Sequence, residues 1–218
     1  MKKLYLLLLL LIVGMGAVGL LTKLGSPRQK IIVKGDYHPG DIIFQTSESR
    51  QSLAIQMATH SPYSHCGVLF QRERQWWVYE AVQPVGICPL EDWIRRGKEG
   101  RYVIKRLKNK TISLREMDSL LTVAVGLNGR DYDPWFEWSD DRIYCSELVW
   151  KLYSRGLGLR IGELQTLGSL DLSAPQVQEI MYERYGNKLP LNDSLITPVA
   201  IFKSPLLKTV FANGEWIN

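Results

Sequence analysis

The stretch Arg142-Ile-Tyr-Cys-Ser-Glu-Leu-Val-Trp-Lys-Leu-Tyr153 decides the fold of this chain. Apolar residues after Cys145 recur at helical spacing, so the sequence predicts an amphipathic helix with the cysteine at or just before its first turn. The N-terminus of a helix carries partial positive charge and unpaired N–H groups, which stabilise a thiolate and can bind an oxyanion. Cys145 is therefore a candidate nucleophile. The alternative is that it is one more small buried apolar residue, as most free cysteines are.

A second segment contains a candidate general base for this nucleophile. Residues 63–82 are rich in strand formers and are interrupted by a polar run, which predicts a β-hairpin. If Phe70 pairs with Gln75, then His65 lies directly opposite Glu80 on one face of the sheet. A carboxylate there would orient the imidazole and stabilise its protonated form, as the third member of a catalytic triad does. The alternative is an ordinary strand histidine, and a one-residue slip would place the two side chains on opposite faces.

Five motifs carry a resemblance to a known family. They are Pro39-Gly-Asp-Ile-Ile-Phe44, His60-Ser-Pro-Tyr-Ser-His65, Tyr79-Glu-Ala-Val82, Trp138-Ser-Asp-Asp141 and Tyr144-Cys-Ser-Glu-Leu-Val149. Together, and in this order, they resemble the YiiX/YebB/YaeF-type cysteine hydrolases, the circularly permuted branch of the NlpC-like papain-fold superfamily. The match runs from about Tyr37 to Leu207. His65 precedes Cys145 by 80 positions, which is the permuted order of the two catalytic segments.

The resemblance implies a role for each residue of the site. Cys145 matches the nucleophile, and His65 matches the general base that later acts as general acid. Glu80 matches the position of the orienting polar residue. Tyr144, directly before the nucleophile, is a candidate donor to the oxyanion. The mechanism that follows is acyl transfer from an amide to water through a thioester.

Three further polar residues lie near these segments. Asp140 and Asp141 could read a free amine on the substrate, or they could cap the nucleophile helix. His60 is expected to cap a helix or to line the entrance of the site. The aromatic residues of the segment 132–138 are expected to line one wall of the cleft or to belong to the core.

The expected elements place strands in one portion of the chain and helices in others. This pattern fits an α+β domain with a mostly antiparallel sheet packed against the nucleophile helix, as the circularly permuted papain-like fold implied by the resemblance requires. Besides the hairpin and the nucleophile helix, the sequence predicts strands at residues 41–44 and 102–106 and helices at residues 49–59, 90–96, 114–125, 176–185 and 198–202.

The N-terminal segment predicts export. Residues 1–24 hold two lysines followed by an uncharged apolar run, which matches the roughly 18 residues that a spanning helix needs. We expect a signal-anchor, or alternatively a cleaved signal peptide, with the body outside the cytoplasm in the bacterial periplasm or envelope. Residues 25–36 form a basic tether, and residues 37–218 form one hydrolase domain. The sequence does not define an oligomeric state.

Composition, histidine spacing and the few cysteines limit which partners, cofactors and disulfides we expect. The net charge of +5 suits anionic lipid headgroups or a cell-wall polymer, and the chain has no nucleic-acid-binding motif. The three histidines lack metal-ligand spacing, so we expect no metal and no cofactor. A Cys66–Cys88 disulfide is conceivable, and Cys66 is expected to face away from His65 into the core.

The substrate is the least defined part of the prediction. The resemblance and the export segment together favour an amide in a peptidoglycan peptide. The alternative is lipid chemistry by a thioesterase, acyltransferase or amidase, which an apolar tunnel leading to Cys145 would favour over an open polar groove. A third possibility is a catalytically silent binding module of the envelope, against which the intact Cys145, His65 and Glu80 argue.

Overall fold

A six-stranded sheet forms the centre of the computed structural model, which describes residues 35–214. Its strands are arranged in the order β10-β5-β1-β2-β3-β4, and every neighbouring pair is antiparallel. The prediction of a mostly antiparallel sheet is therefore confirmed. The strands are β1 (Ile42–Gln45), β2 (His65–Arg72), β3 (Gln75–Glu80), β4 (Gly86–Pro89), β5 (Val103–Leu107) and β10 (Leu207–Ala212).

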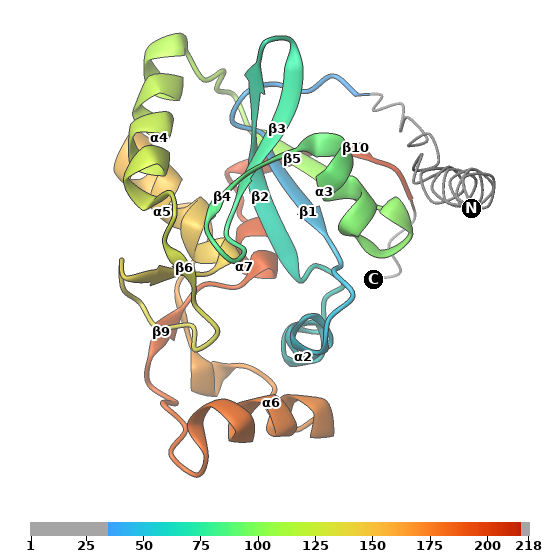
Figure 1. The fold of residues 1–218 in the computed structure, drawn as a ribbon, viewed down its shortest axis with the longest axis vertical. Coiled ribbons are helices and arrows are strands. Elements are labelled where there is room, and N and C mark those ends of the chain that lie inside the picture. The colour runs from blue at the N-terminus through green and yellow to red at the C-terminus, as the bar shows by residue number, and fades with distance from the viewer. Residues whose placement is uncertain (1–34, 215–218) are drawn as a thin grey trace, which may run out of the picture. The chain divides into compact units, whose positions relative to one another are not determined.

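Helices cover the sheet on both sides. The nucleophile helix α5 (Cys145–Leu157) packs on β2 and β3 and is covered in turn by α4 (Leu114–Leu127), while α3 (Leu90–Arg96) lies on the other side (Figure 1). Helix α5 begins at Cys145, as the apolar spacing predicts. Most of its side chains are buried, including a Glu147–Lys151 ion pair of 2.6 Å. Both residues lie on α5, four positions apart, and each offsets the other's charge in the interior, where either charge alone would be costly.

The β2–β3 hairpin forms in a register that differs by two residues from the prediction. Arg72 pairs with Gln75 across a two-residue turn, and Val68 pairs with Tyr79. Both turn residues, Glu73 and Arg74, have positive φ, which the tight turn requires and which the sequence did not signal with glycine. Glu80 is therefore not directly opposite His65. A shift of two residues preserves the face, so both side chains remain on the same side of the sheet.

The remaining elements build a lobe beyond the end of the sheet. Helix α2 (Arg50–Thr59) contacts α6 (Pro175–Tyr185) there (Figure 1). The last helix is α7 (Pro198–Phe202), and short pairs are formed by β6 (Asp131–Tyr132) with β7 (Arg142–Ile143) and by β8 (Gln165–Thr166) with β9 (Ser194–Leu195). Single turns of 3₁₀ helix occupy Lys98–Gly100 and Leu167–Ser169.

The fold shows whether the conceivable disulfide between Cys66 and Cys88 is formed. Cys66 and Cys88 are free thiols. They lie on β2 and β4, which are separated by β3, and Cys66 packs in the core while the Cys88 thiol contacts Glu80, so the conceivable disulfide is absent.

Among the described residues, no helix is long and apolar enough to cross a membrane. The predicted export segment, residues 1–24, lies outside the described residues.

Candidate active site

Cys145 occupies the first position of α5 and is almost completely buried, with 3% of its surface exposed. Tyr144 caps the helix with an extended backbone, and its N–H donates to the carboxylate of Glu147 at 3.3 Å. The first N–H groups of a helix have no acceptor within the helix. These donors and the positive end of the helix dipole therefore surround the thiol, where they favour a thiolate and a developing oxyanion.

His65 begins β2 and bonds directly to Glu80, the last residue of β3. The distance from His65 Nε2 to Glu80 Oε2 is 2.7 Å, and both side chains are buried. The imidazole lies parallel to the ring of Trp93 on α3 at 5.9 Å, which fixes its plane. The second carboxylate oxygen of Glu80 accepts hydrogen bonds from Arg96 and from the Cys88 thiol. Glu80 is thus held on both oxygens, and it holds the imidazole in one orientation.

The protonation states of the pair follow from these contacts. A hydrogen bond from the Cys66 thiol, and the hydrogen bond and charge of His65, hold the pKa of Cys145 well below its ordinary value despite burial. Burial alone would lower the pKa of His65, but Cys145 and Glu80 together raise it to about 9. Burial likewise opposes the ionisation of Glu80, yet His65 and Arg96 lower its pKa to about 2. The site therefore holds a thiolate, an imidazolium and a carboxylate at neutral pH.

The two ring nitrogens of His65 have different partners, and this difference matters for catalysis. Because Nε2 is bonded to Glu80, Nδ1 is the ring nitrogen that remains to exchange a proton with Cys145. Proton transfer to a positioned base that a third group orients is the arrangement that cysteine and serine hydrolases share. The structure thus brings together the three residues that the sequence assigned to one site.

Tyr132 is a residue of the site whose role the sequence did not reveal. Its hydroxyl accepts a hydrogen bond of 2.5 Å from Gln51 Nε2 on α2. Burial, and the negative charge of the Cys145 thiolate, raise the pKa of Tyr132, so the hydroxyl keeps its proton. Because the hydroxyl accepts in this bond, it still has a proton to donate, which makes Tyr132 a candidate oxyanion donor. The sequence named Tyr132 only as one of several aromatics before the nucleophile helix.

Tyr144, the predicted oxyanion donor, directly precedes Cys145, and its hydroxyl is bonded to the backbone of a distant segment. Its hydroxyl oxygen accepts a 3.0 Å hydrogen bond from the Ile196 N–H, and its ring meets Phe136 edge to face. This contact joins the start of α5 to the segment after β9. The oxyanion role of Tyr144 stays a prediction, and the Tyr132 hydroxyl is a second candidate for that role.

The three tentative substrate-binding residues lie outside the catalytic group. Both oxygens of Asp140 are bonded to Arg155, at 2.7 and 2.8 Å, and one also accepts from Lys151 at 2.7 Å. Asp141 is exposed. His60 ends α2 in a left-handed conformation and pairs with Asp171 at 3.0 Å, with 74% of its side chain exposed. His60 therefore caps α2, while the hollow that it lines does not include Cys145.

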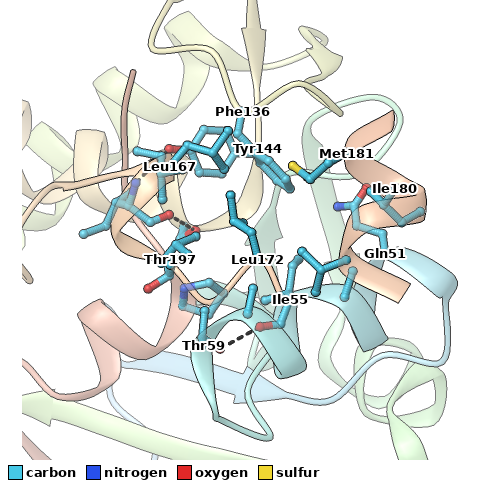
Figure 2. Close-up of a pocket in the computed structure, with 18 of the residues that line it drawn as sticks. Gln51, Ile55, Thr59, Phe136, Tyr144, Leu167, Leu172, Ile180, Met181 and Thr197 are labelled. Atoms are coloured by element: carbon cyan, nitrogen blue, oxygen red, sulfur yellow. Dashed lines mark hydrogen bonds between the residues drawn. The ribbon is translucent and has the colours of Figure 1, made fainter. Parts of the chain in front are cut away.

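Two hollows meet at the catalytic pair. A narrow cavity of about 50 Å³, lined mostly by apolar side chains, reaches Cys145 between α2, α6 and the segments around Leu167 and Ile196 (Figure 2). An open groove of about 650 Å³ reaches His65 and is lined mostly by polar residues, among them Gln45, Ser64 and Arg96. Gln51 and Ile55 border both hollows. The imidazole therefore faces a space with more polar side chains than the space that the thiol faces.

An antiparallel sheet with a nucleophilic cysteine at the N-terminus of a packed helix, and a histidine and a carboxylate on neighbouring strands, defines a papain-like cysteine hydrolase. The histidine comes first in the chain, so the fold is the circularly permuted form. The chain belongs to the permuted papain-like amidase family C92, of the YaeF/YiiX type, whose family model matches residues 36–211. It is therefore a cysteine hydrolase of the amidase or peptidase type.

Two relatives from Escherichia coli support this assignment. The chain is 49% identical over 177 residues to YiiX of strain K12, a protein described as uncharacterized, covering 81% of this chain and 86% of the relative. A crystal structure described as that of the metalloprotein YiiX from Escherichia coli O157:H7 matches with a TM-score of 0.78 at 48% identity. It covers 80% of this chain and 97% of the other. In the present chain, residues 35–214 contain no cluster of three or more His, Cys, Asp or Glu side chains arranged to hold a metal ion.

Proposed function

We propose that this enzyme cleaves an amide bond in the bacterial envelope through a thioester on Cys145, releasing a polar amine. The observation that carries the proposal is the buried group of Cys145, His65 and Glu80 at the start of α5. Acyl transfer requires a nucleophile, a proton donor and oxyanion donors, and the thiolate, the oriented imidazolium and the adjacent N–H groups supply them.

Each step uses a group already in position. The Cys145 thiolate attacks the amide carbonyl, forming a C–S bond, while the N–H groups of α5 and the Tyr132 hydroxyl hold the oxyanion. The imidazolium of His65 then gives its proton to the leaving nitrogen as the C–N bond breaks. Water attacks the thioester with His65 as base, which releases the acid and restores the thiolate.

The polar groove supports a peptide-like leaving group. His65 must protonate the departing amine, and the groove on its side is open and bordered by many polar side chains. Such a surface suits an amino acid or a short peptide, including one derived from peptidoglycan. The export segment predicted at residues 1–24 would place this site outside the cytoplasm, where such peptides occur.

The test is to trap the acyl-enzyme. Full-length protein is mixed with p-nitrophenyl acetate, quenched within seconds and examined by peptide mass spectrometry. We expect one acetyl group on Cys145, none in Cys145→Ala, and at least tenfold slower labelling in His65→Ala. Acetylation at other residues only, or an equal rate in His65→Ala, would contradict the proposal and revive the alternative of a silent binding module.

A further inference from the structure

Arg96 reaches the catalytic group from helix α3. Its Nη2 donates to Glu80 Oε1, the carboxylate oxygen that His65 does not use. The same nitrogen donates to Cys88 Sγ at 3.3 Å, and the Cys88 thiol donates in turn to Glu80 Oε1 at 3.1 Å. Glu80 therefore has His65 on one oxygen and Arg96 with Cys88 on the other.

The spacing of residues on α3 places Arg96 beside Glu80. Trp93 and Arg96 are three positions apart, so they share one face of the helix. Trp93 lies against the imidazole of His65, and Arg96 contacts the carboxylate to which that imidazole is bonded. Arg95, the neighbouring residue, pairs instead with Asp92 at 2.5 Å. One face of α3 thus contacts both members of the His65–Glu80 pair.

The charges of the buried group balance only when Arg96 is included. At neutral pH, Cys145 and Glu80 carry two negative charges and His65 carries one positive charge, and all three side chains are buried. The Arg96 guanidinium adds the second positive charge, and a guanidinium keeps its proton in proteins. Arg96 keeps much of its hydration, because 46% of its side chain is exposed where it borders the polar groove.

Further titratable side chains beside this group keep their protons at neutral pH. Burial raises the pKa of the thiols of Cys66 and Cys88 and of the hydroxyls of Tyr132 and Tyr144. The guanidinium of Arg184 on α6 donates to an amide rather than to either anion. None of these side chains therefore replaces the contact that Arg96 makes.

We infer that Arg96 is a positioning residue of this enzyme, which fixes the Glu80 carboxylate against His65 and balances the charge of the buried thiolate, imidazolium and carboxylate. The inference rests on the proposed function and adds a fourth residue to its site. Without Arg96 the interior would hold one excess negative charge, so the group would bind a proton at a higher pH. A contacting opposite charge changes the pKa of a carboxyl by roughly 1 to 3.

The experiment measures alkylation of Cys145 by iodoacetamide in the full-length protein between pH 4 and 8, with the modified peptide quantified by mass spectrometry. Alkylation needs the thiolate but no proton transfer, so it reports ionisation separately from turnover. For the wild type we expect the rate to change less than about twofold between pH 5 and 8. In Arg96→Gln the rate should fall at least about fivefold from pH 7 to pH 5, with a midpoint roughly one pH unit or more above that of the wild type.

Two variants control for the loss of a surface cation. Arg95→Gln removes the same atoms from the adjacent residue of α3, whose side chain has a similar exposure of 41%. Its pH profile should match that of the wild type. Arg96→Lys keeps the positive charge and should restore most of the wild-type profile, although an ammonium cannot reproduce the planar guanidinium.

A double variant separates charge balance from damage to the fold. Glu80→Gln combined with Arg96→Gln removes one negative and one positive charge, so the group is balanced again. Its midpoint should lie roughly one pH unit or more below that of Arg96→Gln alone. An unfolded chain would instead titrate as a free thiol with a pKa of about 8.5. If Arg96→Gln alone titrates in that way, the double variant carries the test, and a free-thiol profile there as well would overturn the inference.

The other outcomes separate this inference from the proposed function. A profile of Arg96→Gln equal to that of the wild type, or an equal change in Arg95→Gln, would overturn the role of Arg96 while leaving acylation of Cys145 intact. A midpoint in the double variant that is no lower than in Arg96→Gln would rule out charge balance and overturn it too. If p-nitrophenyl acetate does not acylate Cys145 in the wild type, the proposed function fails, and the role of Arg96 falls with it.

Discussion

At the scale of single residues, the ionisation of Cys145 and His65 sets the pH range of the enzyme. The pKa of Cys145 is lowered well below its usual value, and that of His65 is raised to about 9. At neutral pH the pair is therefore thiolate and imidazolium. Alkylation of Cys145 by iodoacetamide should therefore be rapid and nearly independent of pH from about 6 to 8, where a free thiol is mostly protonated. His65→Ala should slow alkylation at pH 6 at least tenfold.

Turnover should respond differently to alkaline pH. Above pH 9 the imidazolium loses the proton that it gives to the leaving amine, so hydrolysis of an amide should fall while alkylation of the thiolate continues. The measurement is a pair of pH profiles on one preparation, with Cys145→Ala as the labelling background. Burial raises the pKa of Cys66 and of Cys88, so neither thiol should contribute below pH 9. Alkylation that begins only at alkaline pH would mean that the pair is not ionised.

The hydroxyl of Tyr132 is expected to act on the transition state rather than on substrate binding. Tyr132→Phe removes one donor while keeping the ring, and loss of one oxyanion donor costs roughly 100-fold to 1,000-fold in kcat. We expect kcat to fall by at least tenfold with KM nearly unchanged, since the α5 N–H donors remain. Tyr144→Phe is the matched control: its hydroxyl bonds Ile196, so thermal stability should decrease more than kcat. The reverse result would return the oxyanion role to Tyr144.

At the scale of elements, Asp140 serves the packing of α5. Its carboxylate joins Lys151 and Arg155, two residues of the helix, and Lys151 is buried. Asp140→Asn should lower the free energy of unfolding by about 1 kcal/mol and the Tm by about 3 °C, with KM unchanged. The adjacent Asp141→Asn should change neither value, because Asp141 is exposed. A rise in KM without loss of stability in Asp140→Asn would restore the alternative that this carboxylate binds an amine of the substrate.

The elements also show what the sequence could predict. Apolar spacing located α5 and its first residue, and the α3 and α7 boundaries agree with the structure. The hairpin was predicted with the right face but a register two residues away, because nothing in the sequence marked Glu73 and Arg74 as a positive-φ turn. Strands β4 and β10 were not predicted. Both depend on pairing with distant strands, a tertiary effect that local propensity does not contain.

Residues of the candidate site that stand in local motifs could be predicted from the sequence, whereas those that only folding brings together could not. Cys145, His65 and Glu80 stand in the local motifs that carry the family resemblance, so the sequence could assign them to one site. The Tyr132 hydroxyl is bonded to Gln51, 81 positions earlier in the chain, and only the folded structure brings them together. The walls of the cavity likewise come from α2, α6 and the segments between, which carry no common motif. A pocket assembled from distant segments is a property of packing rather than of any one stretch of sequence.

At the scale of the whole molecule, the export that residues 1–24 predict would determine which substrates the enzyme can meet. Lys2 and Lys3 precede the apolar run, and positive charge on the N-terminal side favours a cytoplasmic N-terminus with the remainder translocated. Alkaline phosphatase fused after Asn218 should therefore be active in bacterial cells, and a fluorescent protein that folds only in the cytoplasm should stay dark at the same position. Deletion of residues 1–24 should reverse both results. An active phosphatase in the deletion variant would show that another segment directs export.

Fractionation of the same cells distinguishes an anchor from a cleaved signal. A signal-anchor keeps its apolar run, so the intact chain should remain in the membrane fraction after washing with alkaline carbonate, and its N-terminal peptide should be detected by mass spectrometry. A cleaved signal would leave a shorter chain in the periplasmic fraction. The uncharged run at residues 4–21 exceeds the 7–15 residues common in cleaved signals, and we therefore expect the anchored form.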